Sequence, residues 1–204
     1  MIPQRHEWIA EDFIAGALCL ELTNTVGDHS KTRDLERLTD WDALLKWAVA
    51  AKVLRGTEAQ ELRKVGTRDR SGAQRALQAL LEFREALFNT ISALAADRVP
   101  VRDDFDRLEA TILSAVRSAH LARRGERFEW HIGSLDAPLD IPLFRLALSA
   151  LDLLQGQELQ YARECLRCSW LFIDRSRSHG RRWCRADACG NRARVARHYH
   201  AKSS

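Results

Sequence analysis

Four of the five cysteines fall within 25 consecutive residues near the end of this 204-residue chain, and their spacing constrains its fold most. The pattern is C-x2-C, fifteen further residues and C-x4-C, formed by Cys165, Cys168, Cys184 and Cys189. Two close pairs at about this separation are typical of zinc sites, because each tight turn supplies two thiolates to a tetrahedral ion. The sequence therefore predicts one bound zinc ion. Four cysteines leave no open position for a catalytic water, so we expect the zinc to be structural.

Close cysteine pairs also occur in three different kinds of site. A disulfide framework is typical of secreted proteins, but Glu7, Glu11 and Asp12 stand where a signal peptide carries positive charge. A redox C-x-x-C would leave the second pair without a role, and an iron–sulfur cluster is the third alternative. The longest apolar run, near Phe13–Leu20, is far too short to span a membrane. We therefore expect a cytoplasmic protein that does not enter a membrane.

Charge divides the chain at almost the same place. Residues 163–204 carry 11 basic and 3 acidic side chains, a net charge of +8, whereas residues 1–162 carry a net charge of −4. Ten of the eleven basic residues are arginines, which suit phosphate and base-edge recognition. A basic tail on a mildly acidic body favours nucleic-acid binding. A solvated basic face, or contact with an acidic patch on the same protein, is the alternative.

The first 160 residues show mostly helical periodicity. Apolar residues at helical spacing predict helices near residues 13–21, 41–48, 57–61, 71–91, 101–120 and 143–154. Phe128, Trp130 and Ile132 alternate with polar residues, which predicts a half-buried strand. The predicted fold is mainly α with a small β element. We divide it into a helical domain, residues 1–160, and a small four-cysteine zinc module of β-knuckle and helix, residues 161–204.

The tail also carries a recognisable motif. The run Cys189-Gly190-Asn191-Arg192, with the segments 165–177 and 181–184 before it, resembles the CGNR zinc finger. Residues 16–25, 44–48 and 84–87 resemble the ABATE domain, the usual partner of that finger. Ser169 departs from the glycine that the family usually has there. The resemblance implies a bacterial, stress-linked transcription regulator in which the finger reads DNA.

A helix over residues 191–201 separates its side chains into two groups. Val195 and Tyr199 lie one turn apart, and we expect them to pack toward the zinc knuckles with Trp170 and Trp183. Arginines on the opposite side would face outward. The predicted nucleic-acid-binding residues combine these with the arginines of the loop between the cysteine pairs: Arg175, Arg177, Arg181, Arg182, Arg194 and Arg197. The alternative for the loop is a basic segment that only keeps the tail soluble.

We expect a different role for Asn191, Arg192 and Asp174. We predict that Asn191 and Arg192 hydrogen-bond the zinc thiolates, a backbone turn or Asp174, and so support the metal site. Direct contact of Asn191 and Arg192 with nucleic acid is the alternative.

The helical domain offers fewer candidate sites. Asn24, Thr25, Arg33 and Arg84 could line a polar ligand pocket between helices, or could cap helices and pair with carboxylates. No catalytic constellation is visible, so we predict no enzyme activity. The predicted function is DNA binding by the zinc module. We expect the N-terminal domain to sense a small-molecule or protein effector. The sequence is also compatible with a homo-oligomer. An RNA-binding zinc module and a protein-interaction scaffold are the alternatives.

Overall fold

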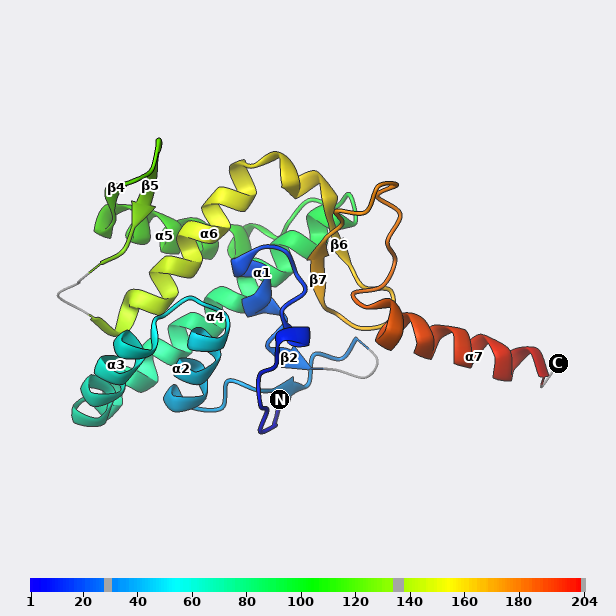
Figure 1. Cartoon of the computed structure of the whole chain (residues 1–204), viewed down its shortest axis with the longest axis horizontal. Coiled ribbons are helices and arrows are strands. Elements are labelled where there is room, and N and C mark those ends of the chain that lie inside the picture. The colour runs from blue at the N-terminus through cyan, green and yellow to red at the C-terminus, as the bar shows by residue number, and fades with distance from the viewer. Residues whose placement is uncertain (28–30, 134–137, 203–204) are drawn as a thin grey trace.

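The computed structural model describes residues 1–27, 31–133 and 138–202, without the side chains of residues 124 and 197–202. Residues 1–161, which we call the helical body, pack around one long central helix (Figure 1). The helices of the body are α1 (Leu18–Thr23), α2 (Trp41–Ala50), α3 (Gly56–Arg68), α4 (Arg70–Ala95), α5 (Arg102–Ser118) and α6 (Ile141–Gln155). The predicted mainly α fold is confirmed.

Local sequence signals set the ends of several helices. The Asp40 carboxylate accepts a hydrogen bond from the Ala43 N–H at 2.8 Å and so caps the start of α2. Asp69 lies one position before α4 begins, and it caps that helix in the same way by accepting a hydrogen bond from the Gly72 N–H. Gly156 follows the last residue of α6. Most predicted helices therefore form, with α4 beginning at Arg70. The helix predicted near residues 13–21 was wrong about its start, because α1 begins only at Leu18, after Gly16 takes a left-handed φ of 82°.

Short strands join the helices. In the first sheet β1 (Ile2–Pro3) pairs in parallel with β3 (Leu35–Glu36), and β3 pairs antiparallel with β2 (Val26–Gly27). Short 3-10 turns, which add no layer to the fold, are η1 (Ala10–Asp12), η2 (Pro138–Asp140) and η3 (Gln157–Tyr161).

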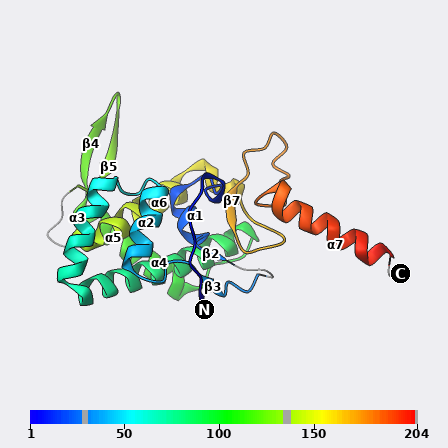
Figure 2. The same cartoon turned by 60° about the horizontal axis from the view of Figure 1, so that its bottom comes forward.

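The predicted strand around Trp130 belongs to a hairpin that stands away from the helices (Figure 2). The hairpin consists of β4 (His120–Arg124) and β5 (Arg127–His131). Phe128 is 67% exposed and Trp130 45% exposed, whereas Ile132 beyond the strand is buried. The prediction of a half-buried strand was therefore wrong about its burial. Alternation shows that one face is apolar, but no layer of the helical body covers that face.

Residues 162–202, which we call the C-terminal module, begin with the antiparallel strands β6 (Ala162–Glu164) and β7 (Leu171–Ile173). A π-helical turn, η4 (Ala186–Gly190), leads into α7 (Asn191–Lys202), which projects away from the rest of the molecule (Figure 1). Within the described residues, no helix is long and apolar enough to cross a membrane.

Candidate metal centre and neighbouring sites

The four clustered cysteines converge on one point of the C-terminal module. Their Sγ atoms all lie within 4.8 Å of one another, and all four side chains are buried. The Sγ atoms of Cys168, Cys184 and Cys189 are separated by 3.6, 3.6 and 3.7 Å. Tetrahedral bonds of about 2.3 Å to zinc require sulfur atoms about 3.8 Å apart. The cluster can therefore hold one zinc ion, as the spacing predicts.

Strand ends and turns bring the cysteines together. Cys165 directly follows β6 and Cys168 precedes β7, so the first pair closes the turn of a small hairpin. The Cys165 N–H donates to the Trp170 carbonyl oxygen at 2.9 Å, and the Arg167 N–H donates to Cys165 Sγ at 3.5 Å. Cys184 ends the long loop, and Cys189 lies in η4. The spacing seen in the sequence thus corresponds to two knuckles.

The residues of the Cys-Gly-Asn-Arg motif support the second knuckle. Arg192 Nη2 donates to Cys189 Sγ at 3.1 Å, and this contact raises the pKa of the guanidinium. A Cβ atom added at Gly190 would lie 3.1 Å from Trp183 Cδ1, so only glycine fits comfortably at this position. Asn191 is exposed at the start of α7. Arg192 therefore offers its cation to a thiolate, the kind of contact that tunes a metal ligand.

Asp174 organises the loop between the cysteine pairs. Its side chain is buried and accepts hydrogen bonds from the Ser176 N–H at 2.9 Å and the Arg181 N–H at 2.8 Å. Its carboxylate thus holds both ends of the loop segment 174–181 in place.

The six predicted nucleic-acid-binding arginines fall into different environments. Arg175 pairs with Glu158 at 2.7 Å and donates to the Gly16 carbonyl oxygen at 2.9 Å, so it fastens the module to the helical body. Arg181 donates to the carbonyl oxygens of Trp183 and Cys184 and covers the Phe172 ring. Tertiary contacts thus occupy these two arginines.

The remaining arginines include three with exposed side chains. Arg177, Arg182 and Arg194 are exposed and have no carboxylate partner within the described part of the chain. Arg182 lies over the Trp183 ring, with 5.5 Å from its guanidinium carbon to the ring centroid. The side chain of Arg197, like that of Tyr199, lies outside the described residues.

Helix α7 does not pack as predicted. Val195 is 46% exposed. The knuckles are packed instead by Trp170, Trp183 and Ile14, the last of which comes from the helical body. The body thus supplies an apolar contact to the core of the module, and Val195 is not among the residues that pack against that core.

A clamp of hydrogen bonds joins the module to the helical body. The Asn24 side chain donates to the Leu171 carbonyl oxygen and accepts from the Leu171 N–H, both at 2.9 Å. Trp170 Nε1 donates to the Val26 carbonyl oxygen at 3.1 Å. Leu171 and Ile173 also belong to the buried core of the body. Asn24, predicted to line a ligand pocket, thus serves as an extra partner for the edge of β7.

The other predicted pocket residues form an ion network. Arg84 is fully buried; it binds both carboxylate oxygens of Glu36, at 2.9 and 2.6 Å, and Glu85 at 2.7 Å. It also donates to Thr25 Oγ1, and Arg33 pairs with Glu85 at 3.0 Å. The structure therefore brings Thr25, Arg33 and Arg84 together. The two arginines pair with carboxylates, which is the alternative that the sequence left open, whereas the Thr25 hydroxyl donates to the Leu22 carbonyl oxygen at 2.7 Å.

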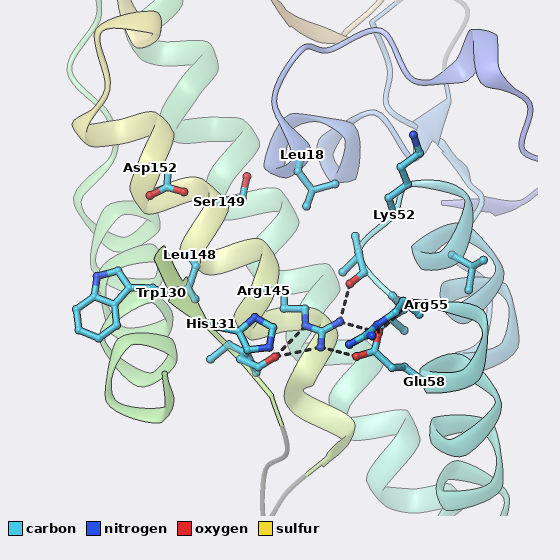
Figure 3. A pocket seen from close by; sticks show the side chains of 14 residues that line it. Leu18, Lys52, Arg55, Glu58, Trp130, His131, Arg145, Leu148, Ser149 and Asp152 are labelled. Atoms are coloured by element: carbon cyan, nitrogen blue, oxygen red, sulfur yellow. Dashed lines mark hydrogen bonds and ion pairs between the residues drawn. The ribbon is translucent and has the colours of Figure 1, made fainter. Parts of the chain in front are cut away.

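Sequence reasoning missed a large pocket in the helical body (Figure 3). Its volume is about 820 Å³, and α1, α2, α3, β5 and α6 all contribute lining residues. Arg145 of α6 links three lining segments of the pocket. It donates hydrogen bonds to Glu58 at 2.7 and 3.0 Å and to the carbonyl oxygens of Val53 and Ile132. The hydrogen bond from Arg145 lowers the pKa of Glu58 to about 2. No local motif marks this site, because its walls come from distant segments.

Two family models match the chain. The ABATE family, described as "Putative stress-induced transcription regulator", matches residues 16–157. The CGNR zinc finger matches residues 162–202. None of the curated proteins compared with the chain matches it. The two matches meet close to the start of β6.

Proposed function

The chain belongs to the ABATE family and ends in a CGNR zinc finger, and from this premise we propose that it is a transcription regulator whose C-terminal module binds DNA. The zinc ion would tie the two knuckles together through Cys165, Cys168, Cys184 and Cys189, and its role would be structural. Such a regulator would act in the bacterial cytoplasm, where it reaches the chromosome. The proposal includes no enzymatic activity.

The projecting helix α7 carries this proposal. It has 12 residues and is therefore about 18 Å long, and only its first turn adjoins the knuckles (Figure 1). The major groove of duplex DNA admits a single α-helix. Arg192 and Arg194 are both exposed at the start of α7, but Arg192 donates to Cys189 Sγ, whereas Arg194 has no carboxylate or thiolate partner within the described residues. A helix presented in this way can enter the groove while the zinc knuckles remain outside it.

Two exposed loop arginines add to the positive charge of the module. Arg177 and Arg182 are exposed on the segment between the cysteine pairs. Arginine side chains in such loops suit phosphate oxygens, which position a protein on the duplex without reading its sequence. We therefore assign phosphate contacts to Arg177 and Arg182, and groove contacts to α7.

The burial of the aromatic residues favours duplex DNA over single-stranded RNA. Proteins that bind single strands stack bases on exposed aromatic rings. Phe172 is fully buried under Arg181, and Trp170 is committed to the Val26 carbonyl oxygen. These rings serve the core of the module and the join to the body.

Binding of a genomic-fragment pool to the zinc-loaded full chain, followed by fluorescence anisotropy of a selected duplex, tests the proposal. We expect Arg194→Ala to weaken binding about tenfold. Arg177→Ala with Arg182→Ala should lower the slope of log affinity against log salt by about 0.9 for each phosphate that is no longer neutralised. Arg75→Ala is the matched control. Arg75 is exposed near the start of α4, about 25 Å along that helix from Ser92, which binds Glu164 of the module.

Three results would overturn the proposal. The first is duplex affinity that stays constant as salt rises, since phosphate contacts always release counterions. The second is an equal effect of Arg75→Ala and Arg194→Ala. The third is tighter binding to single-stranded RNA than to any duplex. A salt-insensitive complex with a protein partner would favour the scaffold function instead.

A further inference from the structure

The pocket of the helical body has the size of a small-molecule site. Its volume of about 820 Å³ lies within the range of roughly 300–1,000 Å³ typical of ligand pockets. One face of α6 forms its wall with Arg145, Leu148, Ser149 and Asp152, which follow helical spacing. The corner between α2 and α3 forms the opposite wall, and Leu18 of α1 lies between them (Figure 3).

The pocket exposes apolar surface that a ligand could cover. Trp130, from the hairpin, is 45% exposed and Val49 is 38% exposed, and both line the pocket. Leu18 and Leu148 complete this apolar lining. Large exposed side chains gathered in a concave site are typical of ligand grooves. An aromatic ligand suits this portion, because Trp130 offers a ring against which a second ring can stack or meet edge to face.

Positive charge collects at the α2–α3 end of the pocket. Glu58 is the carboxylate at this end, and it forms ion pairs with Arg145 at 2.7 Å and with Arg55 at 3.7 Å. Lys52 has no carboxylate partner within the described residues. It follows α2 in the left-handed conformation, with φ of 63°, and it lines the pocket. The lining around this end thus contains one carboxylate, Glu58, and three cations.

The opposite end of the pocket has the opposite character. Asp152 lies on the α6 wall, across the pocket from Lys52 (Figure 3). Asp152 is a carboxyl group, so an acidic group of a ligand is repelled at this end of the pocket and attracted by the cations at the other end. The arrangement therefore favours one acidic group, placed at the α2–α3 end.

We propose that this pocket binds a small aromatic monocarboxylic acid, whose ring contacts Trp130, Leu18 and Leu148 and whose carboxylate pairs with Lys52 and Arg55. Arg145 is a positioning residue, because Glu58 and two backbone carbonyl oxygens already use its five N–H groups. It keeps α3, α6 and the end of the hairpin in register around the ligand.

Helix α1 connects the pocket to the C-terminal module. Leu18 opens this six-residue helix and lines the pocket, and Asn24 at its end holds Leu171 of β7. A ligand that shifts α1 would therefore shift the clamp on the module. This effect on DNA affinity rests on the proposed function, whereas ligand binding itself does not.

Calorimetric titration of the zinc-loaded full chain with 2-naphthoate, 2-naphthamide and 2,6-naphthalenedicarboxylate tests the site. The three probes share a ring and differ in charge. We expect the monoacid to bind about two- to fivefold more tightly than either the amide or the diacid, since an exposed ion pair contributes up to about this much. Lys52→Ala should abolish the preference for the acid over the amide. Trp130→Ala should weaken both.

Lys64→Ala is the matched control, because Lys64 is an exposed lysine of α3 that does not line the pocket. It should leave all three affinities unchanged. No binding of the monoacid at about 1 mM, equal binding of acid and amide, or equal effects of Lys52→Ala and Lys64→Ala would each overturn the proposed site.

A parallel measurement of DNA affinity with and without 2-naphthoate separates the two proposals. Calorimetric binding without any DNA binding by the chain would overturn the proposed function and keep the pocket. DNA binding without calorimetric binding of the acid would do the reverse. If both ligands bind and neither alters the other's affinity, the connection through α1 is refuted, because coupling must be reciprocal.

Discussion

Replacing Asn24 by alanine would test how the helical body and the C-terminal module are joined. The Asn24 side chain is 2% exposed and makes two hydrogen bonds of 2.9 Å with the backbone of Leu171, itself fully buried. Truncation would leave the Leu171 N–H and carbonyl groups buried without partners. Each unsatisfied group costs about 1–3 kcal/mol. We therefore expect the free energy of unfolding to fall by about 2 kcal/mol or more.

Urea unfolding of the zinc-loaded protein, followed by far-ultraviolet circular dichroism, measures this change. With a slope of about 3 kcal/mol per M for a chain of this size, the midpoint should fall by about 1 M. Asn89→Ala is the control, since the Asn89 amide donates to Asp104 at the surface. A surface truncation of this kind changes stability by less than about 0.5 kcal/mol.

The outcome distinguishes two ways of holding the module. A midpoint for Asn24→Ala within about 0.2 M of the wild-type value, with the slope unchanged, would refute the clamp. A new early transition that leaves the main midpoint in place would show that the module detaches before the body unfolds. A single transition shifted by about 1 M would show that body and module unfold together.

Three further predictions concern the metal, pH and the cohesion of the body. Arg192→Ala should weaken zinc binding about 10- to 100-fold, because the cation beside Cys189 is removed. A competition titration with a chromogenic chelator measures this change, and an unchanged zinc affinity would contradict the role of Arg192 in supporting the metal site. Burial raises the pKa of Glu21 from 4.5 to about 7, and one of its carboxylate oxygens has no partner. The stability contributed by protonated Glu21 is therefore present below pH 4.5 and is lost as pH rises through 7, on the order of 2 kcal/mol. Glu21→Gln should remove this fall in the urea midpoint between pH 5 and pH 8, and equal pH profiles would refute it. Chelation of zinc should unfold residues 165–190 and keep most of the helical circular dichroism. The melting temperature of the remaining helical body should fall, because Leu171 and Ile173 leave its core. Complete loss of helicity would show that the body cannot fold alone.

The sequence by itself determined the features that depend on near neighbours. The spacing of the four cysteines predicted a zinc site, because each pair lies on one tight turn and needs no distant segment to form. The same holds for α2 and α6, whose apolar periodicity and terminal residues Asp40 and Gly156 are local signals. Helical projection separated Arg192 from Arg194, and the structure places them differently, one against Cys189 and one in solvent.

Only the tertiary structure decided which polar and apolar groups find partners. Arg175 and Arg177 look alike in the sequence, and both are exposed, yet only Arg175 is bound by Glu158 and the Gly16 carbonyl oxygen. The apolar face of the hairpin stayed uncovered, and the pocket beside Trp130 arose from five separate elements. The physical reason is that periodicity and capping act over a few residues, whereas burial and pairing depend on segments brought together from as far apart as Asn24 and Leu171.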